Sequence, residues 1–452
     1  MGGLIGRRSL LRAAAAAGAG AMAMAVPATA TAARAGEEQE PVRAALLRAS
    51  RPLRSTVPGT DPSDLRAFGA MVGDARVVGL GEATHGSHEF FAMKERVFRY
   101  LVEEKGFTAF ALEMSWPAGL LIDEFVQGGP GDARQVVRAA LGGSPWEREE
   151  FLHLVEWMRD HNRRNPRCRV HFMGDDIGAP RVGDAFFERV TGYVRRRHPE
   201  LLPRFTELYT GLRPLDDSFA YLRGPLAERR RLATNAEAAF RLLEGQQGQD
   251  GQEFEWAVQH ARSIAQTAVF LGVDLQDEGA LRAAMLQRDR VMADNILWWH
   301  RRTGQRMLVS AHNGHVAYVP DDPGTHPKSQ GGFLREALGA GYLPVGLTFG
   351  QGSFLSQDEQ GPSGIPDRAW TRFTVGPPAP GTTEETLDRV RHGDFYLDVR
   401  SAPPAARAWL DTARPLRSIG TGYPVPLNTV RIAESFDVLV HLHRVREADA
   451  LG

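Results

Sequence analysis

The sequence of 452 residues has a single cysteine, Cys168, so it forms no disulfide within the chain. It has no excess of either charge, because 54 Lys and Arg residues stand against 55 Asp and Glu residues. This balance gives no support to nucleic acid as a partner. The body of the chain has no run of 18 or more strongly apolar residues, so it predicts no membrane span. A Gly-x-Ser-x-Gly segment, which would place a nucleophilic serine after a strand, is also missing.

The remaining composition is that of an ordinary globular protein, with 42% hydrophobic and 24% charged residues. A chain of this length buries enough core to fold without disulfides. We expect Cys168, which lies beside a predicted strand, to be an inert core residue. The length fits two to three domains, or one large α/β unit with an inserted lobe.

The N-terminus has the pattern of an export signal. The pair Arg7-Arg8 precedes an Ala-rich, weakly apolar stretch, and small residues at positions 28–35 supply cleavage motifs. Paired arginines before such a stretch resemble a twin-arginine signal. We therefore expect residues 1–35 to be a signal peptide and the mature chain to be secreted or extracytoplasmic. The alternative interpretation is an Ala-rich tail without a targeting role.

Strand-like and helix-like segments alternate in the first part of the mature chain, which predicts a parallel sheet with covering helices. From about residue 182 to 305 the strand pattern gives way to long helical stretches, and strands then return. The sequence thus predicts an α/β fold with a parallel-sheet core, covering helices and an inserted helical lobe. The Pro/Gly-rich stretch 361–383 is predicted to be a surface loop or flap. The predicted parts are a core at 36–181 and 306–452 and a lobe at 182–305. Strands are expected near 76–81, 108–113, 169–175, 307–311, 343–349, 395–399 and 438–442, and helices near 87–105, 119–127, 148–165, 226–243, 253–271 and 281–300.

Three of the predicted strands end in histidine or carboxylate side chains. Gly81-Glu82-Ala83-Thr84-His85-Gly86 follows the first strand, Glu113 ends the second, and His312 and His315 follow a later one. Ligands of open α/β sheets bind beyond the carboxyl ends of the strands, so we expect these groups to converge. Histidine changes charge near physiological pH and can accept a proton from water, and Glu82 could orient the His85 ring. The set suits general acid/base chemistry or a metal site.

Other polar residues near these strand ends have two interpretations each. Lys94 lies on an otherwise apolar helix row and either reaches the site or extends its stem to solvent. Asp175 and Asp176 end another strand, where one of them either caps the next segment or serves the site. Arg288 and Asp289 fit a salt-bridged helix face better than a cleft.

Taken together, these motifs resemble the erythromycin esterase family. The resemblance rests on Gly81–Gly86 with Lys94, on Gly106–Glu113, on Gly174-Asp175-Asp176, on Arg288-Asp289 and on Ala311–Val316. It covers nearly the whole mature chain. It implies hydrolysis of a macrolactone ester, as in macrolide resistance, without a serine nucleophile and without an obligatory metal or other cofactor.

The resemblance also implies roles for single residues. His85 would activate water, Glu82 and Glu113 would orient it or bind the water, and His312 would polarise the carbonyl. Binding of the substrate would fall to Lys94, His315, Asp176 and Arg288. Lys94 stands where some family members carry Arg, which makes a bidentate role doubtful.

Three other functions remain open at this point. The same site could belong to a tailoring enzyme that performs cyclisation or transfer. Glu82, His85, Glu113 and His312 could instead bind Zn²⁺ or Mn²⁺ in a metal-dependent hydrolase. The chain could also be an exported binding protein, although the Glu/His set argues against this. In each case the expected partner is a small molecule, and the sequence does not predict an oligomeric state.

Overall fold

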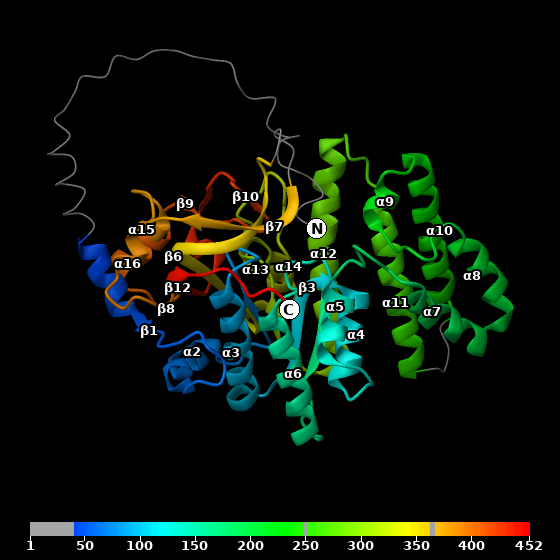
Figure 1. Ribbon diagram of the computed structural model, residues 1–452, viewed down its shortest axis with the longest axis horizontal. Coiled ribbons are helices and arrows are strands. Elements are labelled where there is room, and N and C mark those ends of the chain that lie inside the picture. Colours follow the sequence, from blue (N-terminus) through cyan, green and yellow to red (C-terminus); the bar gives the residue numbers. More distant parts are fainter. Residues whose placement is uncertain (1–39, 247–250, 362–366) are drawn as a thin grey trace, which may run out of the picture.

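The computed structural model describes residues 40–246, 251–361 and 367–452. The chain forms a ten-stranded, mostly parallel sheet with helices on both faces, which confirms the predicted α/β class (Figure 1). The strands β12, β6, β2, β5, β3 and β4 run parallel, in that order across the sheet. At one edge, β8 pairs antiparallel with β12, and β1 pairs antiparallel with β8. The long strand β6 also pairs with β7 and β10. Strand bounds are β1 Ser50–Pro52, β2 Val77–Leu80, β3 Phe107–Ser115, β4 His171–Asp176, β5 Arg306–Ser310, β6 Tyr342–Asp358, β7 Asp367–Val375, β8 Phe395–Asp398, β10 Gly422–Tyr423 and β12 Val438–Val445, with β9 Arg414–Leu416 and β11 Asn428–Val430 in a separate pair.

The central strands are largely apolar because both faces of the sheet are buried. Along β2, Val77 packs into the core on one face and Val78 into the core on the other. The helices on the Val78 side include α2, α3, α4 and α6, which supply Phe68, Phe98 and Phe125 among others. Their bounds are α2 Arg66–Val72, α3 His88–Lys105, α4 Trp116–Val126, α5 Ala133–Leu141 and α6 Glu149–Arg164.

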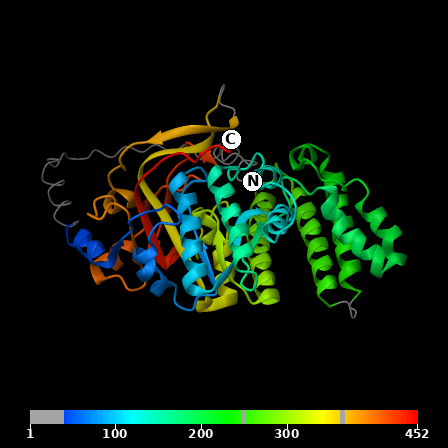
Figure 2. The same ribbon diagram turned by 60° about the horizontal axis from the view of Figure 1, so that its bottom comes forward.

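The described elements between β4 and β5 are all helical. In both ribbon views α7, α10 and α11 stand beside the sheet, and α12 lies between them and the sheet (Figures 1 and 2). The apolar faces of these helices pack into the core on the Val77 side. The bounds of the sequence-predicted lobe stay a prediction. Helix bounds here are α7 Asp184–Arg197, α8 Leu202–Tyr209, α9 Ser218–Leu222, α10 Leu226–Glu244, α11 Gly251–Leu271 and α12 Glu278–Thr303, followed later by α13 Asn313–Val316, α14 Gln330–Leu338, α15 Thr383–Leu387, α16 Pro404–Leu410 and α17 Ile432–Ser435.

Two expectations from the sequence are wrong. The stretch 361–383 is not a loop throughout, because β7 forms a long antiparallel hairpin with β6. Its Trp370 and Phe373 lie within that strand, where aromatic residues are favoured. Cys168 is exposed rather than buried, because it lies in the turn before β4.

Within the described residues, no helix is long and apolar enough to cross a membrane. The predicted export signal lies outside the described residues.

Candidate active site

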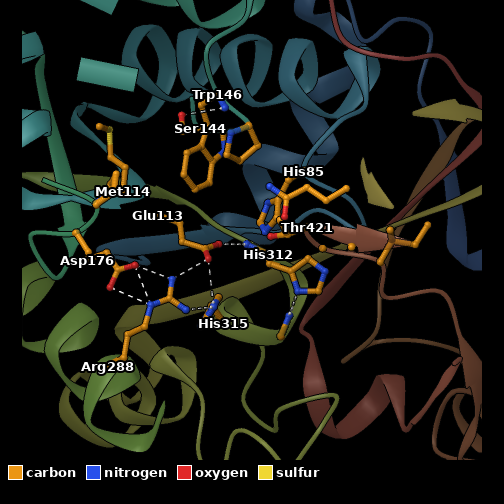
Figure 3. Close-up of a pocket in the computed structure, with 18 of the residues that line it drawn as sticks. His85, Glu113, Met114, Ser144, Trp146, Asp176, Arg288, His312, His315 and Thr421 are labelled. Carbon is orange, nitrogen blue, oxygen red and sulfur yellow. Dashed lines mark hydrogen bonds and ion pairs between the residues drawn. The ribbon is translucent and has the colours of Figure 1, made fainter. Parts of the chain in front are cut away.

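The carboxyl ends of four neighbouring parallel strands, β2, β5, β3 and β4, meet at one edge of the sheet. Each strand end supplies part of the polar set that the sequence predicts there. The side chains surround a cavity of about 390 Å³, which Figure 3 shows in close-up. Six of the predicted site residues line it, and Glu82 and Lys94 lie behind them. The six are His85, Glu113, Asp176, Arg288, His312 and His315.

The turn after β2 is held by close backbone packing. A Cβ on Gly86 would lie 2.0 Å from the carbonyl oxygen of Leu355, so this position requires glycine. The peptide N–H of Ile419 donates to the Ala83 carbonyl at 2.8 Å. That of His85 donates to the carbonyl of Gly420 at 3.2 Å. The loop 418–420 therefore fixes the backbone from which His85 projects.

Glu82 orients His85 and is itself held by Lys94. Its Oε1 lies 2.6 Å from His85 Nδ1, and its Oε2 accepts a hydrogen bond from Lys94 Nζ. Glu82 and Lys94 are fully buried, and His85 is 6% exposed. Burial raises the pKa of Glu82, but Lys94 and His85 outweigh it and leave this pKa below its ordinary value. Lys94 thus does not extend to solvent; it keeps Glu82 ionised.

His312 is a neutral imidazole beside His85. It is the N-cap residue of α13, and its Nδ1 accepts a hydrogen bond from the Gly314 N–H at 3.2 Å. The proton of the neutral ring is therefore on Nε2, which lies 3.4 Å from Ser418 Oγ. Burial lowers the pKa of His312 to about 4. The His85 and His312 rings are 5.4 Å apart, centroid to centroid.

Glu113 joins two of the strand ends. Its Oε2 accepts the backbone N–H of His312 at 2.8 Å, and its Oε1 lies 3.2 Å from His315 Nε2. Arg288 donates to Glu113 at 3.1 Å and to Asp176 at 2.6 Å. Burial raises the pKa of Glu113, but His315, His85 and Arg288 hold it well below its ordinary value. Arg288 therefore belongs to the site and not to an exposed helix face.

Asp175 and Asp176 differ although they are neighbours. Asp176 pairs with Arg288 and also accepts the Ile177 N–H at 2.8 Å, but it caps no helix, because α7 begins at Asp184 with Gly183 as its N-cap. Asp175 is fully buried and accepts from the Gln330 side chain at 2.7 Å. Burial, Asp176 and Glu113 raise the pKa of Asp175 well above its ordinary value.

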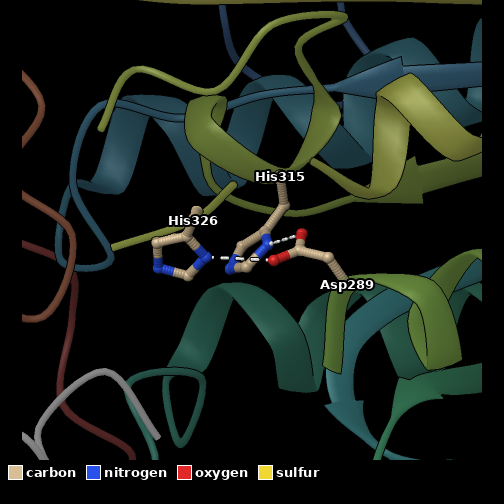
Figure 4. Close-up of side chains that lie close together, drawn as sticks. All are labelled: Asp289, His315 and His326. Atoms are coloured by element: carbon tan, nitrogen blue, oxygen red, sulfur yellow. Dashed lines mark hydrogen bonds and ion pairs between the residues drawn. The ribbon is translucent and has the colours of Figure 1, made fainter. Parts of the chain in front are cut away.

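His326, which no motif in the sequence indicates, lines the cavity from the loop between α13 and α14. Its Nδ1 lies 3.0 Å from Asp289 Oδ2, and Asp289 Oδ1 lies 2.6 Å from His315 Nδ1 (Figure 4). Burial lowers the pKa of His315, but Asp289 and Glu113 raise it well above its ordinary value. His326 follows no strand and has no partner at a short sequence spacing, so no sequence pattern indicated it.

Asp289, His315 and His326 bring one ligand-type atom each within 4.8 Å of one another, as do His88, Glu150 and Asp449 elsewhere. In the first group both carboxylate oxygens of Asp289 already accept N–H donors, including the Gln330 peptide at 2.9 Å. Arg288 lies 3.3 Å from His315 Nε2 and adds positive charge. We interpret this group as hydrogen-bonded pairs rather than metal ligands.

The rest of the cavity wall comes from segments that the sequence did not connect to the site. Trp146 packs edge-to-face on His85 at 5.5 Å. The hairpin strand β7 supplies Trp370 and Arg368, and α9 supplies Phe219. The Arg368 guanidinium lies 4.4 Å from the centre of the Phe219 ring, so the hairpin and the helical region meet at the cavity.

Comparisons with known proteins give matches over much of the chain. The family model described as erythromycin esterase matches residues 102–445. The chain is 25% identical over 324 residues to erythromycin esterase type II of Escherichia coli, covering 66% of this chain and 74% of that protein. The solved structure of a succinoglycan biosynthesis protein matches with a TM-score of 0.79 at 29% identity, covering 91% of this chain and 98% of that one. That of a mutant of the erythromycin esterase EreC in its open conformation matches with a TM-score of 0.70 at 17% identity, over 89% of this chain and 99% of that one, which shows a shared fold.

Proposed function

Because the chain belongs to the erythromycin esterase family, we propose that it hydrolyses a carboxylic ester or macrolactone of a small molecule, with a water molecule activated by His85. The observation that carries this proposal is the pair formed by Glu82 and His85 at the cavity wall. A carboxylate at Nδ1 fixes the tautomer of an imidazole and leaves Nε2 to accept a proton. No hydrogen bond from another described residue occupies that Nε2.

Lys94 supports the pair of Glu82 and His85 through its contact with Glu82. A buried carboxylate beside an imidazole stays ionised only if another positive group compensates its charge. The ammonium of Lys94 does so at Oε2, which leaves Oε1 as a fixed acceptor for the His85 ring. Lys94 is therefore proposed to act through Glu82 and not, as the sequence suggested, on the substrate.

His312 supports the second task of ester hydrolysis, which is stabilising the oxyanion. A neutral Nε2–H is a donor that needs no reorganisation when charge develops on the carbonyl oxygen. Glu113 fixes the His312 backbone through the 2.8 Å hydrogen bond, Arg288 and His315 hold Glu113, and Asp176 in turn pairs with Arg288. We propose that these four residues position His312 and line the substrate side of the cavity.

Ser418 is the alternative nucleophile that this geometry offers, since its Oγ lies near His312. Its hydroxyl, however, donates to Asp321 Oδ2. The His312 tautomer places a proton, rather than a lone pair, toward Ser418, so His312 cannot take the hydroxyl proton. The arrangement thus supports activated water over an acyl-serine intermediate.

The two other enzyme functions are not favoured. Cyclisation or transfer would need an acceptor other than water, and the family match gives no support to it. Metal-dependent hydrolysis through Glu82, His85, Glu113 and His312 is disfavoured because Lys94 and His312 N–H already occupy carboxylate oxygens of Glu82 and Glu113. We expect activity to survive dialysis against a strong chelator.

The test is a substrate panel with the purified protein. Erythromycin, other macrolactones, alkyl esters and aryl esters are incubated with it, and products are followed by mass spectrometry for the gain of one water. Hydrolysis in ¹⁸O-water should label the carboxylate product in a single turnover without a covalent protein adduct. A Ser418→Ala variant should keep turnover. An acyl adduct on Ser418, or no hydrolysis of any ester in the panel, would refute the proposal.

A further inference from the structure

Of the four histidines that line the cavity, two share the same environment. His326, like His85, has its Nδ1 against a carboxylate and its Nε2 without a hydrogen bond to another described residue. The other two histidines already have partners. His312 Nδ1 accepts a backbone N–H, and the two ring nitrogens of His315 lie against Asp289 and Glu113. The cavity therefore holds two imidazoles that are free to transfer a proton.

The carboxylates behind the two imidazoles are also alike. Glu82 binds His85 with one oxygen and Lys94 with the other, and Asp289 binds His326 with one oxygen and His315 with the other. Asp289 is fully buried and also accepts the Gln330 N–H. Burial raises the pKa of Asp289, but His315 and His326 together lower it below its ordinary value. An ionised carboxylate at Nδ1 fixes the orientation of the imidazole and leaves Nε2 to exchange a proton.

We propose that His326 is the general acid of the reaction and delivers a proton from Nε2 to the departing alkoxide oxygen. This inference rests on the proposed function and deepens it. The side chain of His326 is 25% exposed and opens onto the cavity, so a leaving group can reach it. The loop that carries His326 follows α13 in the sequence, whereas the turn that carries His85 follows β2.

The proton balance of the reaction is complete with these two groups. His85 Nε2 takes a proton from water as the water oxygen bonds to the acyl carbon. The tetrahedral intermediate then collapses, the bond between the acyl carbon and the alkoxy oxygen breaks, and His326 Nε2–H protonates that oxygen. Loss of one proton from His85 and uptake of one by His326 from solvent restore the starting state.

The charged and titratable groups around His326 come from three elements. They are Asp289 on α12, His315 on α13, and Asp321 and Asp322 on its own loop. Of these groups, Asp289 is hydrogen-bonded to the His326 ring.

The test compares leaving groups, because a merely structural role would affect all esters equally. A p-nitrophenyl ester departs without protonation, whereas an alkyl ester of the same acid does not. We expect His326→Gln to lower kcat/KM for the alkyl ester by about 10²-fold or more and for the p-nitrophenyl ester by less than about threefold. His392→Gln, which alters an exposed histidine outside the cavity wall, is the matched control.

Two further measurements keep the result decisive. On the alkyl ester, the alkaline limb of the rate–pH profile should disappear in His326→Gln, and added imidazole should restore the rate of His326→Ala. Equal losses on both esters with an unchanged alkaline limb would overturn the role of His326 while leaving the proposed function intact. A wild type that hydrolyses no ester would overturn both.

Discussion

His85 is the side chain whose replacement should impair the reaction most. It alone combines the carboxylate of Glu82 at one ring nitrogen with the neutral donor His312 at 5.4 Å. We predict that His85→Gln lowers kcat by roughly 10²–10⁴-fold, the range for a lost general base, with little change in KM. Steady-state kinetics on the best ester of the panel measures this.

Folding and coupling controls belong to the same experiment. A circular dichroism spectrum and Tm close to wild type separate a chemical loss from unfolding. His312→Ala should also be severe, but the double variant should cost less than the sum of the two, because both groups act on one step. A folded His85→Gln variant with near wild-type turnover would remove His85 from the mechanism.

Lys94 and Glu82 should behave as a pair in stability measurements. Lys94→Met leaves an uncompensated carboxylate in the core, so we predict a loss of about 3–5 kcal/mol in the free energy of unfolding. Glu82→Gln combined with Lys94→Met removes both charges and should cost less than the single lysine change. Urea unfolding of the single and double variants tests this; additive losses would show that the two charges do not depend on each other.

The turn between β2 and α3 offers a prediction about an element rather than one side chain. Gly86→Ala would place a methyl group 2.0 Å from the Leu355 carbonyl oxygen of β6, so the backbone must shift. Overpacking of this kind typically costs about 1–3 kcal/mol. Because the next residue back is His85, kcat should fall as well. Gly376→Ala, which meets nothing within 4 Å, is the control and should leave both quantities near wild type.

The helix α13 links stability to pH through its N-cap, His312. In the folded chain the pKa of His312 is lowered to about 4 from its ordinary 6.5, mainly by burial. Between these values the unfolded chain binds a proton that the folded chain does not, so stability is full above the ordinary pKa and falls as pH drops toward 4.

His312→Asn removes this titration while keeping an N-cap side chain. We predict that the slope of unfolding free energy against pH between 6.5 and 4 becomes smaller by up to about 1.4 kcal/mol per pH unit. Urea unfolding at a series of pH values measures the slope. An unchanged slope would mean that another buried group dominates acid unfolding.

These elements also show what the sequence could and could not predict. The strand ends with Glu82, His85, Glu113 and His312 were predicted because short apolar runs that stop at polar residues have a local signature. His326 was not, since its partner Asp289 lies 37 residues away on another element. The strand β7 was mistaken for a loop because proline and glycine flank it, and its pairing with β6 is visible only in three dimensions.

At the scale of the whole molecule, the cavity is built by the sheet, the hairpin β6–β7 and the helical region together. Trp370 on β7 and Phe219 on α9 line it from elements other than β2, β3, β4 and β5. We predict that Trp370→Ala raises KM for a macrolactone about tenfold and leaves a small alkyl ester nearly unaffected, because only a large substrate reaches these side chains. Thr371→Ala on the same strand is the control, since its side chain is exposed and does not line the cavity. Equal changes for both substrates would place Trp370 in the support of the fold instead.

The loop 418–420 has a consequence for the time at which the enzyme becomes active. It holds the turn that carries His85, yet it lies more than 300 residues further along the chain, and Gly420 must adopt a left-handed φ of 59° to reach it. A nascent chain folds from its N-terminus as it emerges from the ribosome. A chain released only as far as β5 would carry the base on an unsupported turn. We therefore expect the growing polypeptide to be inert toward esters until residues 418–420 have packed against this turn.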